Sequence, residues 1–198
     1  AASHDTAGAA TLRHLSEEDL AASCLALLAQ PALWESLSLP PATRAGAEQR
    51  PWATYWAARL DTSLDVLESR ALLTAARDSF VRHHNPVGEW LCLAAIIEGF
   101  YIDEGPLDPL DTWIAALQEA LPAPNAWPSA ELEARIMACG VGILLRDPMH
   151  PLLATWAQRG PALMRQLLPG AGRLKLATFL AQYHLWRGEF SRMALIVD

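Results

Sequence analysis

Helix-forming segments joined by short turns at a regular spacing most constrain the fold of this chain. The turns centre on Ser63, Gly105, Asp147 and Gly188, which lie 42, 42 and 41 positions apart. A helical hairpin repeated at this period is typical of an α-solenoid, because one hairpin cannot bury its apolar face without a stacked neighbour. The alternative is a compact helical bundle in which the equal spacing is accidental.

Composition supports helices throughout. Apolar residues make up 52% of the chain and charged residues 19%, and Ala and Leu dominate while β-branched residues are few, which favours an all-α fold. We predict one helical-repeat domain over residues 1–198, with 1–15 flexible, N-terminal helices in 16–49 and four antiparallel helix pairs in 51–198. Expected helices cover residues 16–30, 51–60, 64–82, 87–102, 109–121, 130–145, 151–168, 173–187 and 190 to the end.

Two tryptophans occupy corresponding places in successive pairs. Trp113 follows Pro109 in one pair and Trp156 follows Pro151 in the next. Flat aromatic side chains at these positions can wedge between hairpins, so both are expected to be buried.

Charge and cysteine content exclude several functions. The 198 residues carry 15 basic against 22 acidic side chains, a formal net charge of −7, and no basic run, so this segment by itself is not expected to bind nucleic acid. Cys24, Cys92 and Cys139 are scattered and form no CxxC pair, which predicts neither a metal site nor a disulfide and favours the cytoplasm.

No membrane or secretory segment is expected. The start of the chain lacks the pattern of a signal peptide. The most apolar stretch, Leu91–Ile97, is far shorter than the ~20 residues that span a bilayer. The chain lacks an initial Met and ends in the apolar run 193–197 without a stop signal, so we interpret it as a fragment of a longer protein that self-associates weakly through this end.

Chemical motifs are absent from the sequence. It contains no GxSxG, HExxH, GxGxxG, EF-hand or P-loop pattern, and no cofactor is predicted. Glu98 lies within an apolar run, where a partner such as Arg59 or Arg135 would make it structural. The alternative is a small all-helical enzyme, a hydrolase or lyase, that uses Glu98 with His184 or Arg135. His83 and His84 are interpreted as a helix C-terminal cap.

The segment Arg187-Gly188-Glu189-Phe190, followed by a small residue at Ala194, resembles the inner turn of a tetratricopeptide hairpin. Counting back from the turns, the small packing position of that family falls on Ala181 and Gly140 in two pairs. It falls on Glu98 and Trp56 in the other two, which departs from the family pattern. The resemblance therefore implies a tetratricopeptide-like superhelix with elongated repeats of about 42 residues.

A narrower resemblance covers about residues 20–198. The segments Trp34–Pro40, Arg50–Trp52, Leu67–Leu73 and Leu110–Ile114 are similar to the helical-repeat region of large bacterial signal-transducing ATPases, the maltose-activator-like regulators that often end in a LuxR-type DNA-binding domain. This resemblance implies a non-catalytic sensor or scaffold that binds a partner protein, a peptide or a small inducer. It would control a neighbouring ATPase or DNA-binding domain in a larger protein.

The tetratricopeptide resemblance also implies which residues line a groove, because the first helix of each pair faces inward in that family. The positions that bind a ligand or partner would be Arg50, Ala57, Cys92, Ala95, Gly99, Asp103, Met137, Val141, Lys175, Gln182 and Trp186. The middle of such a groove is small and apolar, which suits an amphipathic helix or an extended peptide. The alternative is that these small residues only allow close helix packing.

Overall fold

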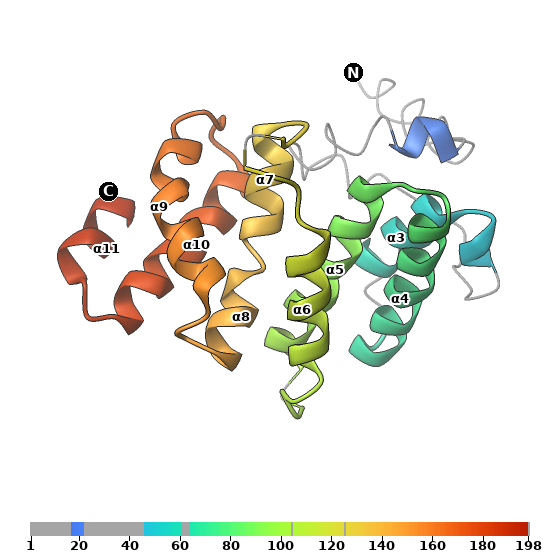
Figure 1. Cartoon of the computed structure of the whole chain (residues 1–198), viewed down its shortest axis with the longest axis horizontal. Helices are drawn as coiled ribbons and strands as arrows, with labels where there is room; N and C mark the ends of the chain where they lie inside the picture. The colour runs from blue at the N-terminus through green and yellow to red at the C-terminus, as the bar shows by residue number, and fades with distance from the viewer. Residues whose placement is uncertain (1–16, 22–45, 61–63, 104, 125, 198) are drawn as a thin grey trace, which may run out of the picture. The chain divides into compact units, whose positions relative to one another are not determined.

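The computed structural model describes residues 17–21, 46–60, 64–103, 105–124 and 126–197, and in these ranges every regular element is helical (Figure 1). The predicted all-α fold class is therefore confirmed. Residues 17–21 are helical, and the labelled elements are η2 (Gly46–Glu48), α3 (Pro51–Leu60), α4 (Val66–Arg82), α5 (Pro86–Ile102), α6 (Leu110–Ala120), α7 (Ala130–Met137), α8 (Gly140–Arg146), α9 (Pro151–Met164), α10 (Ala171–Trp186) and α11 (Phe190–Val197).

The chain divides into two compact units, with the boundary inside α5 between Cys92 and Leu93. In the first unit α3 packs along α4, and η2 contacts both helices. Aromatic side chains fill the space between them: the rings of Trp52 and Phe80 lie 4.7 Å apart, edge to face. The Glu17 carboxylate accepts hydrogen bonds from the backbone N–H of Trp52 at 2.8 Å, so it caps the exposed donors at the start of α3.

In the second unit α10 is the central helix, and α7, α8, α9 and α11 all contact it (Figure 1). Its buried side chains are Leu176, Phe179, Leu180, Tyr183 and His184. Trp156 of α9 packs its indole edge to face against Phe179, with ring centroids 6.2 Å apart. The Phe179 ring of α10 thus packs on Trp156 of α9 and also lies beside Gly140 of α8.

Most helix limits agree with the sequence prediction. Pro51 and Pro151 begin α3 and α9, and the Ser129 hydroxyl accepts the backbone N–H of Leu132 at the start of α7. Asp65 and Glu68 form a capping box at α4 that the sequence analysis did not predict. His83 is the C-cap of α4, as predicted. Predictions for residues 1–16 and 22–45 lie outside the described residues.

The predicted helix over 130–145 is wrong in one respect, because the structure has two helices there. Residues 138–139 form a turn in which the N–H of Cys139 bonds to the carbonyl of Ile136. Two glycines follow, which lowers helix propensity at this place. Glycine at these positions also permits close contacts: a Cβ on Gly140 would lie 2.5 Å from the Phe179 ring, and one on Gly142 would lie 2.8 Å from the carbonyl oxygen of Ile97.

The predicted turns agree with the structure where it is described, whereas the predicted burial of the two tryptophans agrees only in part. Gly105, Asp147 and Gly188 lie between successive helices, as the turn spacing predicts, whereas Ser63 falls outside the described residues. Trp156 is buried but Trp113 is half-buried, so only one of the two has the predicted burial. Among the described helices, none combines the length and the apolar character needed to cross a membrane.

We expect Gly140→Ala to destabilise the protein. The added methyl group would overlap the Phe179 ring, which is held between neighbouring helices, so the free energy of unfolding should fall by about 1–3 kcal/mol. Gly172→Ala is the matched control, because a Cβ at Gly172 meets no atom within 4 Å. It should leave stability unchanged or raise it. Chemical denaturation of both variants measures this, and equal effects would show that Gly140 is not required by packing.

Candidate functional site

The turn between α10 and α11 brings a histidine and a glutamate together. Gly188 follows the end of α10 with φ of +69°, a left-handed conformation that glycine adopts without strain. The N–H of Gly188 bonds to the carbonyl of Leu185 at 3.0 Å, and the N–H of Glu189 bonds to the carbonyl of His184 at 2.8 Å. This is the Schellman motif, in which the residue two beyond the helix end contacts the residue three before it. Here those two residues are Glu189 and His184.

The carboxylate of Glu189 contacts three basic side chains. His184 Nδ1 lies 2.8 Å from Glu189 Oε2, Arg192 Nη1 lies 3.2 Å from the same oxygen, and Arg187 Nε lies 3.4 Å from Oε1. His184 is buried and stacks its ring edge to face on Tyr183. The guanidinium of Arg187 lies over the Tyr183 ring at 5.5 Å. Glu189 thus joins the end of α10 to the first turn of α11.

These contacts determine how Glu189 titrates. The hydrogen bond from His184, followed by those from Arg187 and the charge of Arg192, lowers the pKa of Glu189 below its usual value. A carboxyl group with a depressed pKa stabilises the folded state above its ordinary pKa of roughly 4.3. That contribution is lost as the pH falls through the lower pKa that Glu189 has in the folded state. The contacts of Glu189 between α10 and α11 therefore weaken only in acid.

A pocket of about 650 Å³ opens beside this cluster, and we call it the α9–α11 pocket. Its volume lies within the range typical of ligand sites, about 300–1,000 Å³. One wall is apolar and comes from both α9 and α11, and the other carries the charged cluster. The lining residues are Ala154, Ala157, Gln158, Pro161, Tyr183, His184, Arg187, Glu189, Arg192, Leu195 and Ile196.

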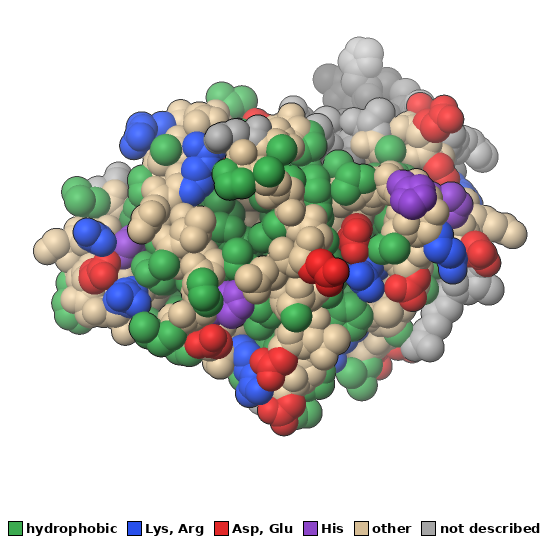
Figure 2. Space-filling model, viewed as in Figure 1, with side chains coloured by type: hydrophobic (Ala, Val, Ile, Leu, Met, Phe, Trp, Pro, Cys, Tyr) green, Lys and Arg blue, Asp and Glu red, His purple; other side chains and the backbone are tan. Residues whose placement is uncertain are grey.

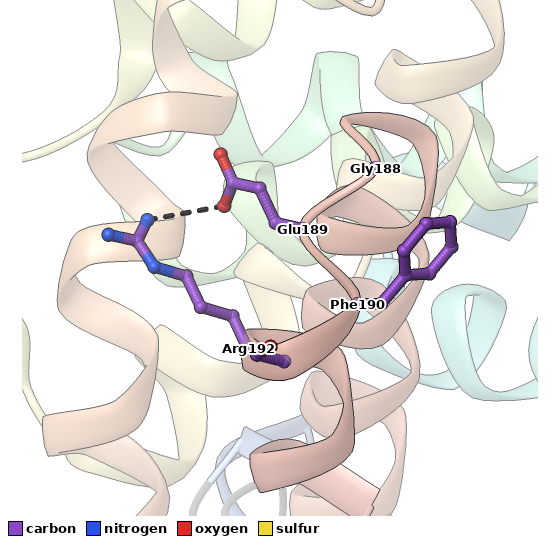
Figure 3. Close-up of a pocket in the computed structure, with 5 residues that line it drawn as sticks. Gly188, Glu189, Phe190 and Arg192 are labelled. Atoms are coloured by element: carbon purple, nitrogen blue, oxygen red, sulfur yellow. Dashed lines mark hydrogen bonds and ion pairs between the residues drawn. The ribbon is translucent and has the colours of Figure 1, made fainter.

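A shallower groove of about 430 Å³ lies at the turn itself and is lined by residues 188–192. Figure 3 shows Glu189 and Arg192 on one side of the backbone, joined by their ion pair, and Phe190 on the other. Phe190 and Leu195 are 62% and 78% exposed. Figure 2 shows hydrophobic, basic and acidic side chains interspersed over the surface of α9, α10 and α11. These helices therefore offer both positive charge and apolar surface.

The sequence carries a signal for this site in its local charge balance, which the net charge of the whole chain conceals. Between positions 151 and 197 there are six of the 15 basic residues but one acidic residue, Glu189, although the whole chain has a net charge of −7. Such an asymmetry between parts of a chain indicates a surface for an oppositely charged partner.

The predicted groove residues are divided between the two units. In the first unit Arg50 is exposed and lies 3.7 Å from Glu17, whereas Ala57 and Cys92 are buried. Their burial gives Ala57 and Cys92 packing contacts in α3 and α5.

In the second unit the predicted positions also differ in exposure. Ala95 and Met137 are buried, Lys175 and Trp186 are exposed, and the half-buried positions are Gly99, Asp103, Val141 and Gln182. None of these eight residues lines the α9–α11 pocket. His184, which lies between Gln182 and Trp186 in the sequence, does line it.

Glu98, the other residue that the sequence singled out, has a structural partner. Arg135 of α7 binds it through both terminal nitrogens, with Nη2 lying 2.8 Å from Oε2. The Arg135 side chain is 5% exposed and that of Glu98 is 17% exposed. Burial, together with the nearby Glu98 carboxylate, raises the pKa of the Cys139 thiol, so this thiol stays protonated and unreactive.

No group of three or more His, Cys, Asp or Glu side chains that could hold a metal ion occurs among the described residues. Comparisons of the chain with protein-family models, with curated proteins and with solved structures found no match.

Removing one partner of the buried Glu98–Arg135 pair should be strongly destabilising. Arg135→Met leaves the Glu98 carboxylate without its main counter-charge, and such losses cost about 3–5 kcal/mol. The double variant Glu98→Leu/Arg135→Met should be more stable than Arg135→Met alone, because no charge is then left unpaired. Chemical denaturation gives both free energies of unfolding.

Arg146→Met is the control for this experiment. Arg146 also binds a carboxylate through two nitrogens, at 2.7 and 2.6 Å from Asp111, but this pair is exposed to solvent and so contributes much less. A loss of stability as large as that of Arg135→Met would contradict the role assigned to burial.

Proposed function

We propose that this chain is a non-catalytic helical-repeat segment of a bacterial regulatory protein. It binds a partner protein, a peptide or a small inducer and controls a neighbouring ATPase or DNA-binding domain. Support for a tetratricopeptide-like superhelix comes from the turns at Gly105, Asp147 and Gly188, which separate helices at the expected spacing. The protein acts in the cytoplasm, and self-association through the C-terminal end is weak.

The α9–α11 pocket is the ligand site in this proposal, and its charge is the observation that carries the argument. The two guanidinium groups of Arg187 and Arg192 face a single carboxylate, that of Glu189. The pocket therefore keeps a surplus of positive charge, while Leu195 and Ile196 provide an apolar wall. A ligand that joins an apolar group to an acidic group matches both features, because complementary charge favours binding and apolar burial adds affinity.

A binding role is better supported than catalysis. His184 oriented by Glu189 resembles the arrangement of a general base, but the lining of the pocket includes no Ser, Thr or Cys that such a base would activate. The alternative enzyme needs Glu98 with His184 or Arg135. Glu98 is held by Arg135 in a largely buried ion pair, and the His184 ring is hydrogen-bonded to Glu189, so each already has a structural partner.

The segment is not proposed to bind nucleic acid, although α9–α11 are basic. Arg159 pairs with Glu133, and Arg187 and Arg192 pair with Glu189. The two carboxylates, those of Glu133 and Glu189, therefore offset two of the six positive charges within the fold. Binding to nucleic acid depends on cations that neutralise phosphates, and this pairing reduces the number available.

A matched series of six-carbon probes tests the proposal. We expect hexanoate, titrated into the ¹⁵N-labelled chain, to shift amide resonances of α9, α10 and α11 in a saturable way. Hexanol should bind more weakly because it lacks the charge, and hexylammonium should bind most weakly because it meets Arg187 and Arg192. Equal responses to all three probes, or shifts that map elsewhere in the chain, would contradict the assignment of the site.

Variants separate the contribution of charge from non-specific apolar binding. The double change Arg187→Gln/Arg192→Gln should reduce the affinity for hexanoate below that for hexanol, because the Glu189 carboxylate then remains in the pocket without either guanidinium. Arg173→Gln is the control, because Arg173 is an exposed cation of α10 that does not line the pocket. It should leave hexanoate binding unchanged.

A further inference from the structure

We propose that the second unit contains another binding site, separate from the α9–α11 pocket, which takes a small uncharged aromatic molecule carrying a hydrogen-bond acceptor. The site is a cavity of about 330 Å³ lined by the end of α6, the connector that follows it, α7 and α9. This volume is at the lower end of the range for ligand pockets, about 300–1,000 Å³, which suits a single or fused ring system better than a peptide. The lining residues that carry the argument are Trp127, Glu133, Met137, Leu152, Trp156 and Arg159.

The apolar walls favour an aromatic guest. Trp127 and Trp156 supply two indole rings and Met137 supplies a thioether. Aromatic rings and sulfur pack favourably against another aromatic ring. Trp156 is buried and packs edge to face with Phe179, so its indole is held in one orientation before any ligand enters.

An ion pair forms the polar part of the wall. Arg159 donates from Nε and Nη2 to the two carboxylate oxygens of Glu133, both at 2.8 Å. The Glu133 side chain is 6% exposed, whereas that of Arg159 is 38% exposed. The group that a ligand can reach is therefore the guanidinium, which has five N–H donors and no acceptor. Two of these donors are used on Glu133, which leaves others for an acceptor on a ligand.

The same pair indicates that the ligand is uncharged. Glu133 already matches the charge of Arg159, and its hydrogen bonds raise the pKa of the guanidinium, which stays protonated. A carboxylate placed on Arg159 would be repelled by Glu133, and an ammonium group would be repelled by Arg159. A carbonyl oxygen accepts from the guanidinium without either cost.

Fluorinated probes of similar size test this inference by ¹⁹F NMR. 4′-Fluoroacetophenone offers a neutral acceptor, 4-fluorotoluene has none, 4-fluorobenzoate adds a negative charge and 4-fluorobenzylammonium adds a positive one. We expect the ketone to bind most tightly, and 4-fluorotoluene to bind roughly 2- to 10-fold more weakly, the affinity equivalent of one hydrogen bond. Both charged probes should be weaker than the ketone. Absence of ketone binding, or equal or tighter binding of either charged probe, would overturn the proposal.

Variants locate the site. Leu152→Trp fills the cavity from α9 and should abolish ketone binding, while Leu168→Trp, at a position that is 82% exposed and outside the lining, should not change it. Arg159→Lys keeps the charge but loses the planar fork of donors, so the ratio of ketone to toluene affinity should fall towards one. Ketone binding that survives Leu152→Trp would place the site elsewhere. The probe series on the unaltered chain decides the proposal even where a variant fails to fold.

Discussion

The carboxylate of Glu189 connects the end of α10 to α11, and the C-terminal site depends on it. A left-handed glycine at Gly188 ends α10, and the Schellman turn that follows sets Glu189 against His184. In many such turns the corresponding contact is hydrophobic. Here Glu189 instead makes a hydrogen bond with the His184 ring and ion pairs with Arg187 and Arg192. One local backbone motif thus orients α11 and also places the charged side chains of Arg187, Glu189 and Arg192 at the α9–α11 pocket.

Local signals accounted for most of the fold. Pro51 and Pro151 mark helix starts because proline suits the first turn of a helix, and Ser129 caps α7 as its side chain predicts. The break between α7 and α8 was not predicted, because it depends on how close Phe179 and Ile97 come to Gly140 and Gly142. Contacts between residues so distant in sequence leave no periodic signal in the sequence.

The candidate site was less predictable than the fold. The groove residues were expected from the family register, which places function along the first helix of each pair, whereas the polar cluster around Glu189 lies at the turn after α10. His184 had been singled out, but with Glu98 as its partner. Its partner in the structure is Glu189, five positions on, a spacing that the glycine at 188 makes favourable. The excess of basic residues after position 150 was readable in the sequence, but it becomes informative only when the chain is divided into segments.

Amide hydrogen exchange of the Glu189→Gln variant tests most directly the claim that this carboxylate holds α11 on α10. The neutral amide weakens the bonds to His184, Arg187 and Arg192, so the amides of α11 should exchange faster while those around Phe179 in α10 keep their protection. Glu119→Gln, a change at an exposed acid of α6, should leave both helices as they are. Unchanged exchange in α11 of the Glu189→Gln variant would contradict the account, because α11 would then be held by its apolar contacts alone.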